Sequence, residues 1–401
     1  MSFGIYLHMP FCRRRCPYCD FYKKVPRAGE VELFPFLLGK EIEHRAVSPF
    51  FSGLEVTSIY FGGGTPSLHP PAHIGHVIET IRCLWPVRDG AEVTLEANPG
   101  TVGLYELKKL YASGINRFSL GVQSFSQRKL QQLFRDHDVL QGRESLGLAR
   151  AAGFGNISMD LIFGIPGETL QEWQNDLEET FRLTPDHVSL YNLEYHSGTP
   201  FYRWRESGKL LALDEQQELE MYLLAHEKLV GAGYEHYEVS NFARPGFRSR
   251  HNMLYWTGAP YLGLGPSAHS YDGSRTRFQN WPDLFSWGSA VDFRQEPISE
   301  IEHLADTQIG LEWLALRLRL ADGVSYREAE EKVGPARATA LWQVAAEIPA
   351  ELMDVQRGHL AIRPRGWFCM NDIVLKLYKA LDRAAPQEHR LARRGLKIER
   401  F

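Results

Sequence analysis

Three cysteines lie within eight residues near the start of the chain, at Cys12, Cys16 and Cys19. Their spacing is C-x3-C-x2-C, and they follow directly after an apolar run at residues 3–8 that is typical of a β-strand. Thiolates this close in sequence can bind three corners of one 4Fe–4S cubane, which leaves the fourth iron open to a small molecule. The alternative is a zinc site that combines the three thiolates with a histidine such as His8. The spacing favours the cluster.

The rest of the composition is that of an ordinary globular protein. Cys83 and Cys369 stand alone, so the five cysteines do not form a disulfide framework. With 45 basic and 49 acidic residues in 401, charge gives no reason to expect nucleic-acid binding. We expect no transmembrane span and no signal peptide, and therefore a cytoplasmic protein. The basic residues between 390 and 400 are expected to form a solvated helix or tail.

Short apolar runs that are typical of strands alternate with amphipathic segments through the first half of the chain. The runs cover residues 3–8, 56–61, 93–96, 118–122, 157–163 and 188–193. Between the last two runs, Thr169 and Glu172 form a capping box, and apolar residues then recur at three and four. Strand–helix repetition of this kind indicates parallel strands with crossover helices. We therefore predict an α/β fold with a partial (β/α)6 barrel over residues 1–235.

The alternation of strand-like and helix-like segments ends after residue 235. Residues 236–300 are rich in Gly, Pro, Asn and aromatic residues, and we expect them to cap the barrel mouth without extending its sheet. Helical patterns return from residue 301, with a β-like pair around residues 353–362. Residues 301–401 are therefore predicted to form a small helical domain of winged-helix type.

Polar residues gather where the predicted strands end, and barrel chemistry collects at the carboxyl ends of strands. The second strand is followed by Gly63, Gly64 and Thr65, and the later strands carry Glu96, Gln123 and Asp160. Buried carboxylates are costly unless they are paired or bind something. These residues predict a polar ligand at the rim. The alternatives are a plain tight turn for the glycines and structural hydrogen bonds for the others.

The cysteine motif, with Tyr18 before its last cysteine, resembles the signature of the radical S-adenosylmethionine (SAM) superfamily. In that superfamily the open iron binds SAM, and an electron from the cluster cleaves it to a 5′-deoxyadenosyl radical. Over nearly the whole chain, the sequence is similar to the coproporphyrinogen III dehydrogenase-like branch, which includes the HemW haem chaperones. The resemblance implies a radical SAM barrel that holds a 4Fe–4S cluster and SAM.

The same resemblance implies roles for individual residues in the SAM site. Gly63, Gly64 and Thr65 would receive the methionine amine of SAM, and Arg135 would pair with its carboxylate. Gln123 and Asp160 would hold the ribose hydroxyls. Tyr6 and Glu96 match further SAM-site positions.

Residues 250–256, Arg-His-Asn-Met-Leu-Tyr-Trp, resemble the HNxxYW motif of the HemW chaperones. A histidine can supply an axial nitrogen to haem iron, and aromatic faces can cover a porphyrin. We therefore expect His251, Asn252, Tyr255 and Trp256 to bind haem, with His251 as the axial ligand and His269 as a second candidate. The alternative is a surface loop whose aromatic residues cover the core.

The resemblance leaves a choice of function within the branch. Porphyrinogen-processing members carry a further cysteine two positions after the third ligand, where this chain has Phe21, and an N-terminal extension that we do not expect here. The motif implies a haem chaperone that passes haem to respiratory proteins at the inner face of a bacterial membrane, with an electron donor. The alternatives are an oxygen-independent coproporphyrinogen III oxidase, which decarboxylates two propionates, and a radical SAM enzyme with another substrate. A homodimer is left open.

Overall fold

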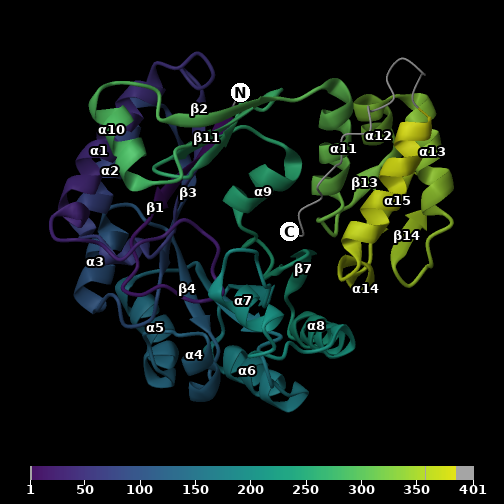
Figure 1. Ribbon diagram of the computed structural model, residues 1–401, viewed down its shortest axis with the longest axis horizontal. Helices are drawn as coiled ribbons and strands as arrows, with labels where there is room; N and C mark the ends of the chain where they lie inside the picture. Colours follow the sequence, from purple (N-terminus) through teal and green to yellow (C-terminus); the bar gives the residue numbers. More distant parts are fainter. Residues whose placement is uncertain (1, 357, 385–401) are drawn as a thin grey trace.

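A twelve-stranded sheet dominates the computed structural model, which describes residues 2–356 and 358–384 (Figure 1). Its strand order is β12-β11-β10-β9-β1-β2-β3-β4-β5-β6-β8-β7. Seven neighbouring strands are parallel: β9 (Tyr261–Leu264), β1 (Ser2–Met9), β2 (Glu55–Gly63), β3 (Val87–Ala97), β4 (Arg117–Gln123), β5 (Ile157–Phe163) and β6 (His187–Asn192). The sheet ends at β12 and β7, so among the described residues it forms a partial barrel, as predicted.

Helices connect the parallel strands and cover their outer face. They are α1 (Glu30–Ala46), α2 (Pro71–Leu84), α3 (Leu104–Ala112), α4 (Gln127–Gln132), α5 (Val139–Ala152) and α6 (Leu170–Leu183), and a 3-10 turn, η1, spans Pro66–Leu68. After β6 come α7 (Pro200–Glu206) and α8 (Glu215–Gly231). The predicted capping box is confirmed, because the Glu172 N–H donates to Thr169 Oγ1 at 3.2 Å and the Thr169 N–H donates to Glu172 Oε2 at 2.9 Å. The helices bury apolar side chains of the strands, such as Ile5 and Ile59.

The segment between residues 235 and 303 adds strands at both edges of the sheet. β7 (Glu235–Glu238) and β8 (Asn241–Ala243) follow β6, while β10 (His269–Tyr271), β11 (Thr276–Asn280) and β12 (Ile298–His303) follow β9. The prediction that this segment does not extend the sheet was therefore wrong. The edge of a sheet carries unpaired backbone N–H and C=O groups, and the short strands of this segment pair with those groups at both edges. Gly263 marks close backbone packing here, since a Cβ on it would lie 2.1 Å from the His269 carbonyl oxygen.

The last part of the chain forms the predicted domain of winged-helix type, at the right of Figure 1. Its three-stranded antiparallel sheet has the order β13-β15-β14. The elements are α11 (Asp306–Arg317), β13 (Val324–Ser325), α12 (Tyr326–Val333), α13 (Pro335–Ala345), β14 (Met353–Gln356), β15 (His359–Ile362), α14 (Pro364–Trp367) and α15 (Met370–Arg383). The basic residues at 390–400 lie outside the described residues.

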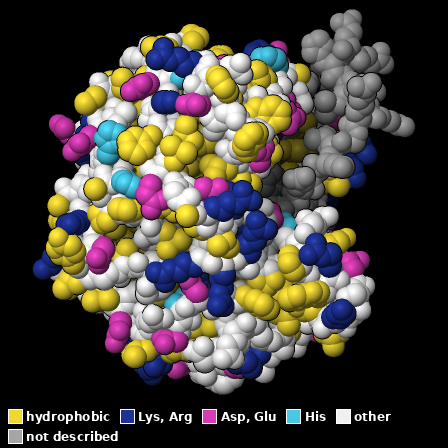
Figure 2. Space-filling model, turned by 60° about the vertical axis from the view of Figure 1, so that its left-hand side comes forward, with side chains coloured by type: hydrophobic (Ala, Val, Ile, Leu, Met, Phe, Trp, Pro, Cys, Tyr) yellow, Lys and Arg dark blue, Asp and Glu magenta, His cyan; other side chains and the backbone are white. Residues whose placement is uncertain are grey.

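The surface carries several exposed aromatic side chains. Phe36 on α1 and Phe285 on α10 (Leu284–Asp292), with Phe293 just beyond α10, are among the most exposed. On the face shown in Figure 2, hydrophobic side chains lie in several groups, and Lys and Arg side chains gather across the middle of the view. No helix in the described part of the chain is both long and apolar enough to cross a bilayer.

Candidate functional site

Alternate residues of the parallel strands turn away from the helices and give the barrel a polar inner wall. Tyr60 on β2 donates a hydrogen bond of 2.7 Å to Glu96 Oε1 on β3. Ser119 on β4 donates to Asp160 Oδ2 on β5 at 3.3 Å. Polar side chains of neighbouring strands are thus bonded across the inner face, which we call the barrel chamber.

The cysteine loop follows β1 at the carboxyl end of the barrel. The loop is closed by a backbone pair, because the Cys12 N–H donates to the Lys24 carbonyl at 3.0 Å and the Lys24 N–H donates to Pro10 at 2.8 Å. Burial, with smaller contributions from the neighbouring Cys19 and Cys16, raises the pKa of the Cys12 thiol to about 11. Three thiols close enough to affect one another's ionisation therefore share one short loop.

This donor set fits a cubane cluster. In the described part of the chain, no three histidine, cysteine or carboxylate side chains converge as ligands of one metal ion. The ligands of a cubane need not meet at one point as the ligands of a single metal ion do, because each thiolate binds a different iron. Two polar groups already contact the thiols: Thr65 Oγ1 lies 3.7 Å from Cys12 Sγ, and Arg135 Nη1 lies 3.8 Å from Cys16 Sγ.

The glycine turn after β2 packs directly on the start of the cysteine loop. The Gly64 N–H donates to the Met9 carbonyl at 2.8 Å, and the Thr65 N–H donates to Phe11 at 2.8 Å. A Cβ on Gly64 would lie 2.6 Å from the Phe11 carbonyl oxygen, so a larger residue could not approach this closely. The glycines therefore have a packing role, and their contact with the SAM amine stays a prediction.

Arg135 and Gln123 meet beside the cysteine loop. Arg135 donates from Nη2 to the Asn98 Oδ1 and to the Gly121 carbonyl, the latter at 2.9 Å, whereas its Nε is buried without a partner. Gln123 has a left-handed φ of 68° and a buried Oε1 that also lacks a partner. Strain and unpartnered buried polar atoms are typical of ligand sites. These two side chains therefore suit a polar ligand next to the cluster.

The predicted carboxylates lie deeper in the same chamber. Burial raises the pKa of Glu96 to about 7, although the Tyr60 hydroxyl donates to it. Burial also raises the pKa of Asp160 above its usual value, with Arg117 and Arg135 opposing the shift. The Tyr6 hydroxyl lies 3.3 Å from Nδ1 of His8. The structure thus brings the predicted SAM residues of five strands into one chamber.

The segment that resembles the haem motif is a helix inside the barrel, α9 (Arg250–Thr257). It lies between the strands β1 and β2 and the helix α11 (Figure 1). Ser249 caps its first turn, and the Glu92 carboxylate accepts the N–H groups of Arg250 and His251, each at 3.0 Å. This helix was not predicted from the sequence, although Ser249 and Gly258 are suitable cap residues at its two ends.

His251 is buried, and both of its ring nitrogens have partners. Nδ1 lies 2.8 Å from the Ser58 Oγ, and Nε2 lies 2.8 Å from the Tyr255 hydroxyl. Its ring stacks on Tyr60 with centroids 5.0 Å apart. Burial lowers the pKa of His251 to about 3, which keeps the imidazole neutral. Because neither nitrogen is free to reach an iron, this arrangement does not support the predicted axial role of His251.

The other predicted haem residues are only partly buried. Trp256 has a buried Nε1 without a partner, and the guanidinium of Arg319 lies 4.5 Å from the centre of its ring. Burial is the largest cause of the raised pKa of Tyr255, and Tyr261 is the next. Tyr6 and Glu96 lie near enough to Tyr255 to contribute as well. The motif therefore borders the chamber of the predicted SAM residues. His269 is exposed and lies on β10, outside α9.

Several polar residues of the inner wall were missed by the sequence analysis. They are Ser58, Tyr60, Glu92, Arg117, Ser119, Ser158 and His187. They could have been found from the alternation of side chains along a strand, because residues an even number of positions apart lie on the same face. Glu92 and Glu96 are four residues apart in one strand, and Ser158 and Asp160 are two apart.

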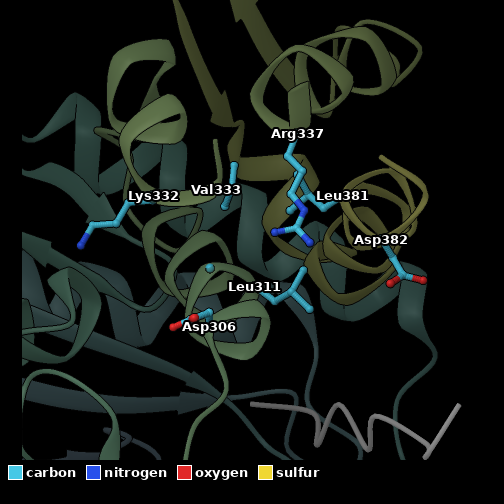
Figure 3. A pocket seen from close by; sticks show the side chains of 8 residues that line it. Asp306, Leu311, Lys332, Val333, Arg337, Leu381 and Asp382 are labelled. Atoms are coloured by element: carbon cyan, nitrogen blue, oxygen red, sulfur yellow. The ribbon is translucent and has the colours of Figure 1, made fainter. Parts of the chain in front are cut away.

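The cavity in Figure 3 lies in the C-terminal domain, far along the chain from these residues. It is lined by Asp306, Leu311, Lys332 and Arg337, among others, and its volume is about 20 Å³. That space suits a water molecule rather than an organic ligand. A second cavity of about 190 Å³ lies between α3 and α5, outside the barrel chamber.

The chain is similar to known proteins of one superfamily. Residues 6–180 match the Radical SAM superfamily. The solved structure of coproporphyrinogen III oxidase (HemN) from Escherichia coli is similar, with a TM-score of 0.80 and 25% identity over 95% of this chain and 90% of that one.

Curated relatives are similar over most of the chain. The "Heme chaperone HemW" of Bacillus subtilis is 34% identical over 82% of this chain and 86% of its own. The mitochondrial "Radical S-adenosyl methionine domain-containing protein 1" of Danio rerio is 38% identical over 82% of this chain and 75% of its own. This chain therefore belongs to the radical SAM superfamily and, within it, to the family of the HemW haem chaperones. Membership of the superfamily implies a 4Fe–4S cluster and SAM.

Proposed function

We propose that this protein is a haem chaperone, which binds haem in the barrel chamber and passes it to acceptor proteins. The observation that carries the proposal is the position of α9. His251 bonds to Ser58 on the inner wall and to Tyr255, and Tyr255 lies near Glu96, so the haem-like motif borders the chamber that holds Glu96. The names of the HemW relatives support the same function.

In this proposal the cofactors would lie at the carboxyl ends of the strands. Cys12, Cys16 and Cys19 would hold the cluster, and SAM would occupy its open iron and supply one-electron radical chemistry. The free Nε of Arg135 would donate to the SAM carboxylate, and the Gln123 amide, together with Asp160, would bind the ribose. The remaining contacts would come from Tyr6, Gly63, Gly64, Thr65 and Glu96.

A second candidate is oxygen-independent oxidation of coproporphyrinogen III. The likeness to the Escherichia coli enzyme favours it, because that likeness covers 95% of this chain. Against it stands Phe21, which occupies the position of the further cysteine and is 64% exposed. The haem-like motif also favours the chaperone.

The proposal includes partners and a location. The acceptors would be respiratory haem proteins, and an electron donor would reach the cysteine loop, where Arg13, Arg14 and Arg15 are exposed. A reducing cytoplasm would keep the thiols available for the cluster. The exposed Phe36, Phe285 and Phe293 would suit peripheral contact with a membrane. A homodimer remains compatible with the proposal.

Haem titration of two tryptophan variants tests this function. Trp256→Ala should weaken haem binding, because its ring lies beside that of Tyr255, with centroids 6.4 Å apart, and is predicted to cover the porphyrin. Trp281→Ala is the matched control, since that ring is 41% exposed and lies outside α9. Equal haem affinity in wild type and Trp256→Ala, or no uptake by the wild type, would contradict the proposal.

A further inference from the structure

The phenol of Tyr255 is held by His251 at the edge of the barrel chamber. Its oxygen lies 2.8 Å from Nε2 of His251, and the two rings meet edge to face with centroids 5.2 Å apart. This is the one hydrogen bond of the Tyr255 hydroxyl within the described ranges. A phenol carries one donor proton and two acceptor lone pairs, so the oxygen can still bind another group.

In one of its two neutral tautomers, the imidazole accepts a hydrogen bond from the phenol. Burial keeps His251 neutral, so one of its two nitrogens lacks a proton and accepts a hydrogen bond. When Nδ1 donates to the Ser58 Oγ at 2.8 Å, Nε2 accepts from Tyr255. Stacking on Tyr60 and the Glu92 contact to the backbone fix the ring in this position. The phenol oxygen, unlike either ring nitrogen, therefore has lone pairs to offer.

We propose that Tyr255 is the axial ligand of the haem iron and that His251 is a positioning residue that takes its proton. This inference rests on the proposed haem function and replaces His251 as the ligand. Tyrosine is a known ligand type for haem iron. Trp256 follows Tyr255 on the same helix, so its aromatic face can contact the porphyrin bound there.

The binding step conserves atoms and electrons. The O–H bond of Tyr255 breaks, its proton moves to Nε2 of His251, and the phenolate oxygen forms a bond to ferric iron, which stays ferric. The imidazolium then donates from Nε2 to the phenolate and from Nδ1 to Ser58. The negative oxygen beside it offsets the cost of a buried positive charge. No oxidant or reductant is needed.

Resonance Raman spectroscopy of the ferric haem complex tests the assignment. The protein would be reconstituted anaerobically with its cluster, loaded with ferric haem and compared with Tyr255→Phe and His251→Ala. Tyr261→Phe is the matched control, because its ring lies 4.7 Å from that of Tyr255 and the Tyr261 hydroxyl does not bond to His251. Cluster absorption and SAM binding report whether each variant folds.

The expected result is a set of iron-bound tyrosinate ring modes in the wild type and in Tyr261→Phe. These modes should vanish in Tyr255→Phe, and haem affinity should fall at least roughly tenfold, as for loss of a charge-assisted contact. They should persist in His251→Ala with weaker binding. Bound haem without tyrosinate modes in the wild type, or unchanged modes in Tyr255→Phe, would overturn the ligand but leave the chaperone proposal intact. A wild type that takes up no haem would overturn both.

Discussion

Replacing Arg135 with alanine should weaken SAM binding strongly. The guanidinium is buried beside the cluster loop, with Nη1 at 3.8 Å from Cys16 Sγ and Nη2 bonded to the Gly121 carbonyl at 2.9 Å. Its Nε is buried and lacks a partner. We expect the SAM carboxylate to satisfy this nitrogen, so truncation removes a charge-assisted contact from a buried site.

The size of the effect follows from the type of contact. Losing a hydrogen bond to a charged group costs about 1.5–3 kcal/mol, which raises the Kd for SAM roughly 10- to 150-fold. The Kd of Arg135→Lys for SAM should lie between those of the wild type and Arg135→Ala, because lysine keeps the charge but lacks the fork of donors. The cluster should still assemble, since Arg135 is not expected to bind iron. The reduction potential of the cluster should be lower in Arg135→Ala than in the wild type, because a positive donor near the Cys16 sulfur stabilises the reduced cluster.

Anaerobic calorimetry of the reconstituted protein measures the affinity. Arg128→Ala is the matched control, because that guanidinium is exposed and pairs with Glu172 at 2.8 Å. Such a surface pair contributes about 0–1 kcal/mol to stability and has no expected contact with SAM. If the SAM affinity of Arg135→Ala equals that of Arg128→Ala, then Arg135 does not bind the ligand.

Three further results are expected. Anaerobic reconstitution should give about four irons per chain, and Cys16→Ala should lower this number, whereas recovery of zinc alone would refute the cluster. Phe21→Cys should not oxidise coproporphyrinogen III, because its exposed side chain does not define the chamber, and a porphyrin product from this variant would favour the second candidate. Glu96→Gln should stabilise the SAM-free protein above neutral pH. Because the pKa of Glu96 is raised from 4.5 to about 7, the wild type loses stability as pH rises through this window, by about 3 kcal/mol at most, and glutamine does not. Urea unfolding across this window should show a growing difference between the two proteins that levels off above pH 7, and a constant difference would contradict it.

Local patterns predicted the barrel well. The six apolar runs became β1 to β6, and the Thr169 capping box opens α6 as expected. The cysteine loop was also predictable, since its ligands are neighbours in sequence. Strand periodicity and nearby spacing are set by a few adjacent residues, so the sequence carries them directly.

Long-range pairing was harder to predict. β9 is only four residues long and pairs with β1 across more than 250 residues of chain, so nothing local distinguishes it from a loop. The position of His251 depends on contacts with Ser58 and Glu92, which belong to strands far away in sequence. A motif predicts which residues matter. The hydrogen bonds that decide their roles appear only when the strands are assembled.

The central claim is that the barrel chamber serves haem rather than coproporphyrinogen oxidation. Its most direct test is one preparation of the anaerobically reconstituted protein, divided between a haem titration and a coproporphyrinogen III turnover assay with SAM and a reductant. We expect saturable uptake of about one haem per chain, through a single axial site on α9, and no porphyrin product. Turnover to a porphyrinogen or porphyrin product without stoichiometric haem uptake would contradict it.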